Sequence, residues 1–187
     1  MISIIIPTIT GREHHLARCL HAYSETLDKC PHEIIVIRDR PTCGIAWNEG
    51  IDRAKGDYIH LSADDLEPHE DWWLAAFVTC SHGHLPEARI LNSDGSLHSC
   101  GFDATERDDG EIAAFGRIPF FPRDLLPVVF PIIETHYFTD VWVSAKARAA
   151  GVETVISRGY LFTHHWAQEG RLSRMQEDQR AYEAALR

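Results

Sequence analysis

The chain begins with an alternation between short apolar runs and segments in which apolar residues recur at helical spacing. Residues 2–6 form a β-branched run that ends at Pro7, and continuous apolar strands of this kind are typical of parallel sheets covered on both faces. Apolar residues between Leu16 and Tyr23 then recur at helical spacing. This pattern predicts an amphipathic helix over about residues 13–27.

The same alternation repeats along the first part of the chain. Apolar runs at residues 33–37 and 58–61 predict two further strands, and residues 45–54 between them predict a helix. The resulting order is β-α-β-α-β, whose crossovers are expected to be right-handed. A nucleotide-binding α/β half is therefore expected for this part of the chain.

The pattern changes after about residue 80. The dipeptide Asp94-Gly95 lies between two short candidate strands within residues 89–99, which is a strong hairpin signal. The other expected elements are an irregular loop at 105–131, a helix at 140–150 ended by Gly151, strands at 152–156 and 160–163, and a polar amphipathic helix at 171–187.

Length and charge narrow the class of protein. A chain of 187 residues with 44% hydrophobic residues is expected to form one domain with a substantial core. Its formal net charge of −10 makes nucleic acid a less expected partner, because phosphate contacts need clustered Lys and Arg. An anionic small ligand held by a metal ion or by backbone donors remains compatible with this charge.

Cysteine usage and hydropathy indicate the compartment. Five Cys are dispersed without a C-x-x-C pair, which favours buried thiols in a reducing compartment over a disulfide frame or a zinc site. The N-terminus has no basic region before its apolar run, and the apolar run at 125–133 is interrupted by Pro127 and Pro131. A soluble, cytoplasmic protein without a membrane span is expected.

The strand at residues 58–61 runs directly into two adjacent carboxylates, Asp64 and Asp65. Two acidic side chains at the tip of an apolar strand repel each other and cannot be buried unpaired, so a cationic group is expected to compensate them. Ligands also collect at the carboxyl ends of strands in α/β proteins. The alternative is that these residues cap a following helix that begins near Trp72.

Five short motifs follow one another in a characteristic order and spacing. They are the strand Ile2–Pro7 with Thr8, the strand Ile34–Asp39, Ala46-Trp47-Asn48-Glu49-Gly50, Gly56-Asp57-Tyr58-Ile59 and Ser62-Ala63-Asp64-Asp65. With them, the first 75 residues resemble the nucleotide-sugar-binding half of family 2 glycosyltransferases of GT-A fold.

Later motifs extend the resemblance over nearly the whole chain. Asp94–Gly101 is similar to a hairpin that follows the acidic DXD-type motif in this family, and Thr139-Asp140 with Gly151 resembles its catalytic helix. The resemblance implies a single GT-A-like α/β domain, a Rossmann-like mixed sheet flanked by helices. Residues 1–80 would be the nucleotide-sugar-binding half, and residues 81–187 the acceptor and catalytic half with a C-terminal helix.

The resemblance implies a metal-dependent, inverting glycosyltransferase that uses a nucleoside-diphosphate sugar. A divalent cation, Mn²⁺ or Mg²⁺, would neutralise the leaving diphosphate. Its ligands would be Asp64, Asp65 and His164, with neighbouring His165 an alternative to His164. Asp140 would be the catalytic base, at a helix start where the dipole favours its ionised form. Donor nucleotide contacts would come from Pro7, Thr8, Asp39, Asn48, Asp64 and Arg171.

Several positions depart from the family pattern or have structural alternatives. Ser62 stands where a carboxylate is common, and Thr139 stands in place of the Glu before the base. Asp39 could be a turn residue, Asn48 a structural brace and Asp140 a helix N-cap. A catalytically degenerate module that binds nucleotide or glycan without transfer is thus the second hypothesis, and a nucleotidyltransferase-like enzyme the third. The acceptor, whether glycan, lipid-linked sugar, protein or modified nucleobase, stays open.

Overall fold

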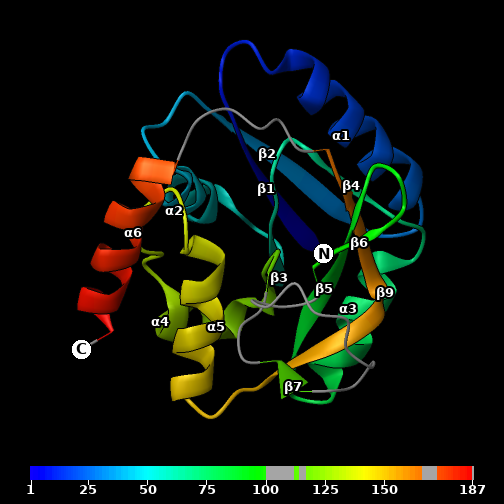
Figure 1. The fold of residues 1–187 in the computed structure, drawn as a ribbon. Coiled ribbons are helices and arrows are strands. Elements are labelled where there is room, and N and C mark those ends of the chain that lie inside the picture. Colours follow the sequence, from blue (N-terminus) through cyan, green and yellow to red (C-terminus); the bar gives the residue numbers. More distant parts are fainter. Residues whose placement is uncertain (100–111, 114–116, 166–171, 187) are drawn as a thin grey trace.

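The computed structural model describes residues 1–99, 112–113, 117–165 and 172–186, which form two sheets flanked by helices (Figure 1). The first sheet has the strand order β2-β1-β3-β8. Its strands are β1 (Ile2–Thr8), β2 (His32–Arg38), β3 (Tyr58–Leu61) and β8 (Phe120–Pro122). Strand β1 pairs in parallel with β2 and β3, and β8 pairs antiparallel with β3. The predicted mixed α/β architecture is confirmed.

The second sheet has the order β4-β9-β5-β6, with β7 paired to β9. Its strands are β4 (Leu66–Pro68), β5 (Leu85–Asn92), β6 (Leu97–Ser99), β7 (Ile112–Ala113) and β9 (Thr154–His164). The helices are α1 (Glu13–Thr26), α2 (Cys43–Arg53), α3 (Trp72–Ser81), α4 (Leu126–Val129), α5 (Thr139–Ala149) and α6 (Leu172–Ala185), with a 3₁₀ turn η1 (Arg123–Leu125).

Strand β1 divides the core because its side chains alternate between the two faces of the sheet. Ile4 and Ile6 pack into a cluster with α1 and α3, whereas Ile5 packs into a second cluster with α2 and α5. Gly50 allows α2 to approach β1 closely, since a Cβ there would lie 2.2 Å from Cγ2 of Ile5. The apolar run at the start of the chain therefore serves two cores, as expected for a strand covered on both faces.

The Asp94-Gly95 hairpin is confirmed, because β5 and β6 pair antiparallel across it and Gly95 has φ +83°. Two other predictions are wrong. Residues 120–122, expected within an irregular loop, form β8, since Phe120 and Phe121 are buried against β3. The two strands expected at 152–156 and 160–163 are one strand, β9, which continues through a register shift opposite Glu87–Arg89.

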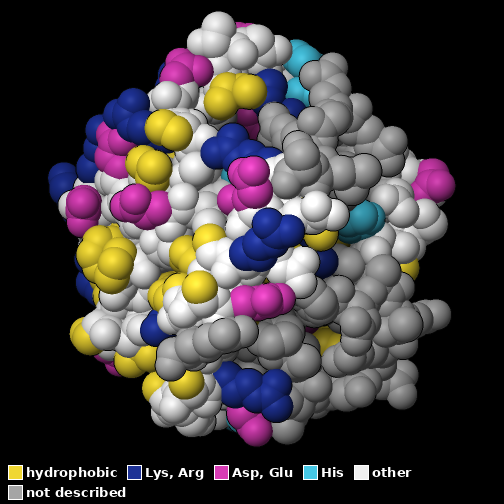
Figure 2. All heavy atoms as spheres, turned by 60° about the vertical axis from the view of Figure 1, so that its left-hand side comes forward, with side chains coloured by type: hydrophobic (Ala, Val, Ile, Leu, Met, Phe, Trp, Pro, Cys, Tyr) yellow, Lys and Arg dark blue, Asp and Glu magenta, His cyan; other side chains and the backbone are white. Residues whose placement is uncertain are grey.

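Within the described part of the chain, no helix has the length and apolar character needed to cross a membrane. On the face shown in Figure 2, basic and acidic side chains are interspersed rather than gathered by sign.

Candidate active site

The carboxyl ends of β1, β2 and β3 bring three predicted site residues to one edge of the first sheet. Thr8 ends β1, and its Oγ1 donates a hydrogen bond of 2.6 Å to Oδ2 of buried Asp64, two residues beyond Ser62. The backbone N–H of Asp39, just after β2, donates to the carbonyl of Thr8 at 2.9 Å. Pro7 precedes Thr8 in the same strand and pairs with Ile37 of β2. The geometry thus gathers Thr8, Asp39 and Asp64.

The cation that compensates the carboxylate pair is Arg12. Its Nε lies 2.9 and 3.1 Å from the two carboxylate oxygens of Asp64, and its Nη2 lies 2.7 Å from Oδ1 of Asp64 and 2.7 Å from Oδ2 of Asp65. A planar guanidinium suits this forked arrangement, which an ammonium group cannot reproduce. The expectation of a compensating cation is confirmed, although the sequence reading did not identify Arg12.

Local backbone geometry explains how Arg12 reaches this position. Gly11, in the turn after β1, has φ +92°, a left-handed conformation that glycine adopts without steric cost. The N–H of Arg12 donates to the carbonyl of Ile9, and Arg12 then stands as the N-cap residue of α1. The sequence did contain a signal for this ion pair: one basic residue follows the first strand, and the acidic pair follows the third.

Asp65 is joined to the end of β9. Its carbonyl accepts a hydrogen bond of 2.9 Å from the N–H of His165, and its Oδ1 lies 3.4 Å from Nε2 of His164. Burial alone would raise the pKa of Asp65, but His164 and Arg12 outweigh it and lower this pKa to about 2. Strand β9 therefore delivers His164 to Asp65, whereas the side chain of His165 lies 3.1 Å from Glu67.

The pair Asp65–His164 fits part of a divalent-cation site. Neighbouring ligands of an octahedral ion at about 2.1 Å lie about 3 Å apart, close to the 3.4 Å observed between these two side chains. Among the residues described, no group of three His, Cys, Asp or Glu could hold an ion, so diphosphate oxygens and water would complete the coordination. Both oxygens of Asp64 are engaged by Arg12 and Thr8, so ligation by Asp64 would require Arg12 to move.

Asp39 lies exposed at the end of β2 with a positive φ of 56°. Its carboxylate accepts hydrogen bonds from the backbone N–H of Thr10 at 2.7 Å and from Thr10 Oγ1 at 3.1 Å, and these two bonds lower its pKa. The carboxylate is thus kept ionised and oriented beside the turn that carries Arg12. A nucleotide contact by Asp39 stays a prediction.

Asn48 is a brace in this structure. Its Nδ2 donates to the carbonyl of Ile132 at 2.9 Å, and its Oδ1 accepts from the N–H of Ile132 at 2.8 Å. The side-chain amide is therefore committed to the segment before α5. The nucleotide contact predicted for Asn48 remains untested, and the one predicted for Arg171 falls outside the described residues.

Ser62 points into the core rather than toward the carboxylate pair. Its hydroxyl is 2.7 Å from the hydroxyl of Tyr23, which is also 2.7 Å from Nε2 of the fully buried His60. Tyr160 extends this network from the other side, with its hydroxyl 3.1 Å from Nδ1 of His60. Ser62 is therefore a core position in this chain.

Asp140 lies in the first turn of α5, whose N-cap residue is Phe138. The alternative that Asp140 is itself the N-cap is therefore wrong.

Cys43 is the first residue of α2. Desolvation raises the pKa of its thiol, and a hydrogen bond with Thr139 offsets part of this rise. The negative charges of Asp140, Asp65 and Asp64 raise this pKa further. Cys43 thus lies within electrostatic reach of both the predicted base and the acidic pair.

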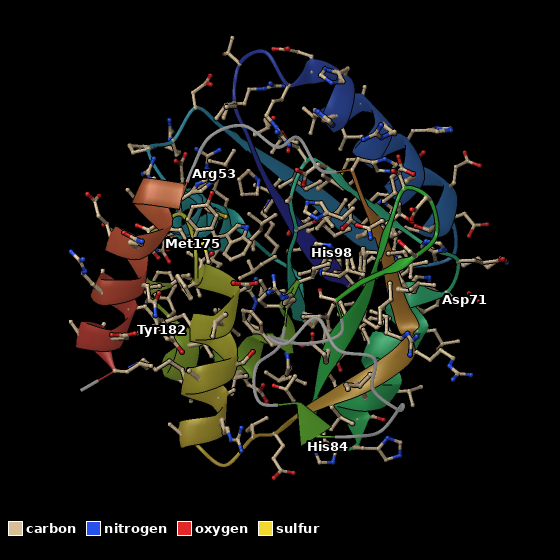
Figure 3. The ribbon with its side chains drawn as sticks, viewed as in Figure 1. Arg53, Asp71, His84, His98, Met175 and Tyr182 are labelled. Atoms are coloured by element: carbon tan, nitrogen blue, oxygen red, sulfur yellow. The ribbon has the colours of Figure 1, made fainter. Side chains whose placement is uncertain are left out.

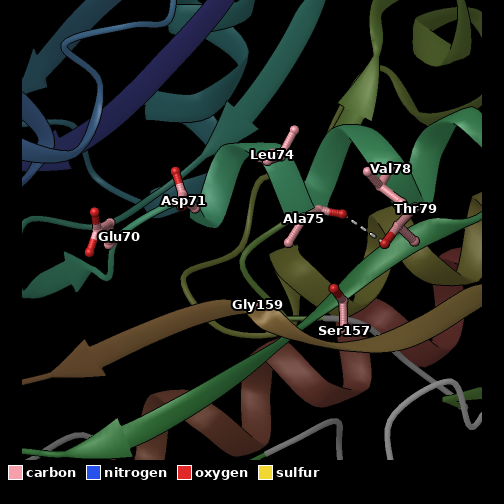
Figure 4. A pocket seen from close by; sticks show the side chains of 8 residues that line it. All are labelled: Glu70, Asp71, Leu74, Ala75, Val78, Thr79, Ser157 and Gly159. Carbon is pink, nitrogen blue, oxygen red and sulfur yellow. Dashed lines mark hydrogen bonds between the residues drawn. The ribbon is translucent and has the colours of Figure 1, made fainter.

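His98 is a further residue at the edge of the site that the sequence reading did not single out. It lies on β6 (Figure 3). Its ring centroid is 5.5 Å from that of His164. A separate shallow groove of about 360 Å³ lies between α3 and β9, lined in part by Leu74, Val78 and Ser157 (Figure 4). None of the predicted site residues lines this groove.

The chain shares its fold with solved structures of S. aureus TarS. One TarS crystal structure aligns with a TM-score of 0.64 at 14% identity over 98% of this chain. TarS 1–349 aligns with a TM-score of 0.66 at 11% identity over 98%, and the complex of TarS 1–349 with UDP-GlcNAc with 0.64 at 12% over 92%. The chain spans 39%, 64% and 60% of these three chains, respectively.

No protein-family model and no curated protein sequence matches the chain. The shared architecture is therefore established by structure alone.

Proposed function

We propose that the chain is a glycosyltransferase that moves a sugar from a nucleoside-diphosphate donor to a hydroxyl acceptor. The observation that carries this proposal is the edge of the first sheet where Thr8, Asp39 and Asp64 come together. At the same edge, Oδ1 of Asp65 lies 3.4 Å from Nε2 of His164. Transfer with inversion would also need a general base within hydrogen-bonding reach of the acceptor hydroxyl, and Asp140 is proposed for this role. The fold shared with TarS, which has been crystallised with UDP-GlcNAc, supports a nucleotide-sugar donor.

In this proposal the residues at the strand ends hold the donor. The ionised Asp39 and the Thr8 region would contact the nucleoside, and Arg12 would hold Asp64 and Asp65 in place. Asp65 and His164 would hold Mn²⁺ or Mg²⁺, which when bound supplies positive charge to the leaving diphosphate. Asp140 would take the proton of the acceptor hydroxyl as the new glycosidic bond forms and the bond to the diphosphate breaks.

The test combines binding and transfer. Thermal-shift assays with UDP-, GDP-, TDP- and CMP-sugars, each with and without Mn²⁺ or Mg²⁺, identify a donor. Asp140→Asn should then abolish transfer while donor binding persists, because the amide keeps the shape of the side chain and loses its basicity. Transfer that survives in Asp140→Asn removes this residue as the base, and the absence of stabilisation by any nucleotide sugar contradicts the proposal.

A second candidate is a module that binds the nucleotide sugar without transferring it. One observation supports it, since the guanidinium of Arg12 contacts both carboxylates of the acidic pair. Metal-independent donor binding, combined with no transfer or hydrolysis by the wild-type protein, would support this module over the enzyme.

A further inference from the structure

Helix α6 contacts the segment that leads into α5, although about forty residues separate them in sequence. The carboxylate of Asp178 in α6 is buried, and its Oδ2 accepts hydrogen bonds of 2.9 Å from the backbone N–H groups of both His136 and Tyr137. We propose that Asp178 is a positioning residue for Asp140, an inference that rests on the function proposed above. A carboxylate that receives two amides makes charge-assisted bonds, which are stronger than neutral ones.

Residues 135–138, which lead into the helix that carries Asp140, have little conformational freedom. Phe138 has φ +64°, a left-handed conformation that is unfavourable for a non-glycine residue and persists only where its surroundings impose it. Thr135 Oγ1 donates to the carbonyl of Tyr137 at 2.7 Å, so hydrogen bonds hold Tyr137 at both its N–H and its carbonyl. Any movement of Tyr137 would be transmitted to Asp140 through only two residues.

A second side chain of α6 reinforces the same contact. Tyr182, one turn beyond Asp178, stacks on the ring of Phe138 with centroids 5.6 Å apart and planes 21° apart. Figure 3 shows Tyr182 on the side of α6 that faces α5. Burial and then the charge of Asp140 raise the pKa of Tyr182, which agrees with this proximity. Its buried hydroxyl has no hydrogen-bond partner among the described residues.

The same face of α6 also reaches the donor side of the site. Arg174, one turn before Asp178, donates from Nη2 to the carbonyl of Pro41 at 2.9 Å, two residues after Asp39. Arg174, Asp178 and Tyr182 are spaced at i, i+4 and i+8 and therefore share one helix face. This face contacts both the turn after β2 and the segment before α5, so it sets the spacing between the two sides of the proposed site.

The chemical consequence follows from the short reach of general-base catalysis. A base must lie within hydrogen-bonding distance of the proton that it accepts, and a displacement of about 1 Å can cost on the order of 100-fold in rate. Loss of the Asp178 contacts should therefore lower kcat and leave the KM for the donor nearly unchanged, because the donor binds at the strand ends. A merely structural role would not produce this separation of kcat from KM.

Three variants test the inference. Asp178→Ala removes both acceptors, Asp178→Asn keeps one carbonyl oxygen able to accept from both amides, and Glu177→Ala is the control because Glu177 is exposed on the same helix. The steady-state rate of nucleotide release is measured with the nucleotide sugar that the wild type turns over, chosen from UDP-, GDP-, TDP- and CMP-sugars. Hydrogen exchange of the amides of residues 135–140 is measured in parallel, with the amides of β1 as an internal reference.

Asp178→Ala is expected to lower kcat about 10- to 100-fold with the donor KM changed less than about twofold, and to accelerate exchange at residues 136–140 but not in β1. Asp178→Asn should recover most of kcat, and Glu177→Ala should match the wild type. If Asp178→Ala leaves kcat and amide exchange unchanged, the inference is overturned while the proposed function stands. The same conclusion follows if Asp178→Asn loses as much kcat as Asp178→Ala. A wild type that binds and turns over no donor overturns the proposed function, and the exchange data then decide separately whether Asp178 holds the segment.

Discussion

Arg12 and Asp64 lie fifty-two positions apart in the sequence and form a forked ion pair in the proposed site. Nη2 of Arg12 lies 2.7 Å from Oδ1 of Asp64. The same nitrogen lies 2.7 Å from Asp65. One guanidinium therefore pairs with two adjacent carboxylates, and its removal would leave Asp64 without its ion-pair partner and Asp65 with His164 alone.

Arg12→Ala should destabilise the protein by roughly 3–5 kcal/mol, because it leaves buried carboxylates uncompensated. Arg12→Lys should recover only part of this loss, since an ammonium cannot reproduce the fork. Urea unfolding monitored by circular dichroism measures both effects. Arg53→Ala is a matched control, because Arg53 pairs with Glu49 on an exposed helix surface and should contribute little. Equal effects of the Arg12 and Arg53 replacements would contradict the assigned role of Arg12.

His60 should make stability depend on pH. Burial lowers its pKa to about 3 in the folded protein from 6.5, so the unfolded chain binds a proton first as the pH falls. The contribution of neutral His60 to the free energy of unfolding is complete above about pH 6.5 and is lost progressively down to about pH 3, by on the order of 5 kcal/mol. The free energy of unfolding of the wild type and of His60→Gln, compared between pH 7 and 4, measures this contribution, because other titrating groups cancel in the difference. Parallel pH profiles for the two proteins would show that His60 does not titrate in this way.

His164→Ala should abolish the part of donor binding that depends on a divalent cation. Calorimetric titration of Mn²⁺ in the presence of UDP provides a readout independent of transfer. His165→Ala is the control, since the side chain of His165 lies beside Glu67 rather than Asp65. Addition of EDTA should reduce binding by the wild type and by His165→Ala, but not by His164→Ala. Mn²⁺ binding that survives in His164→Ala and is lost in His165→Ala would reverse the assignment.

Asn48→Ala should lower stability by about 1–3 kcal/mol, because it leaves the N–H and carbonyl of Ile132 without their side-chain partners. If Asn48 acts only as a brace, the affinity for UDP should change less than about twofold. Thermal denaturation and UDP titration of the same variant separate the two roles. A large loss of affinity with unchanged stability would instead support the predicted nucleotide contact.

Much of the fold could be predicted from local sequence patterns. The apolar run of β1, the helical spacing of α1 and the Asp94-Gly95 turn each depend on neighbouring residues, whose periodicity and turn chemistry act over a few positions. The position of Asp64 and Asp65 beyond a strand end was readable for the same reason. Strand β8 was missed because its three residues form a strand only by pairing with β3.

The partners of the site residues could not be obtained in this way. That Arg12 compensates Asp64, that Ser62 points toward Tyr23, and that Asp178 holds the N–H groups of His136 and Tyr137 are contacts between segments separated by about 40 to 50 residues. Charge and hydrogen-bonding capacity are encoded at each position, but the choice among many possible partners follows from how the sheets and helices pack. The sequence therefore determined the helices, the strands and the acidic residues after β3. Packing determined that Arg12 is their counter-ion, that Asn48 binds Ile132 and that Asp178 binds the segment before α5.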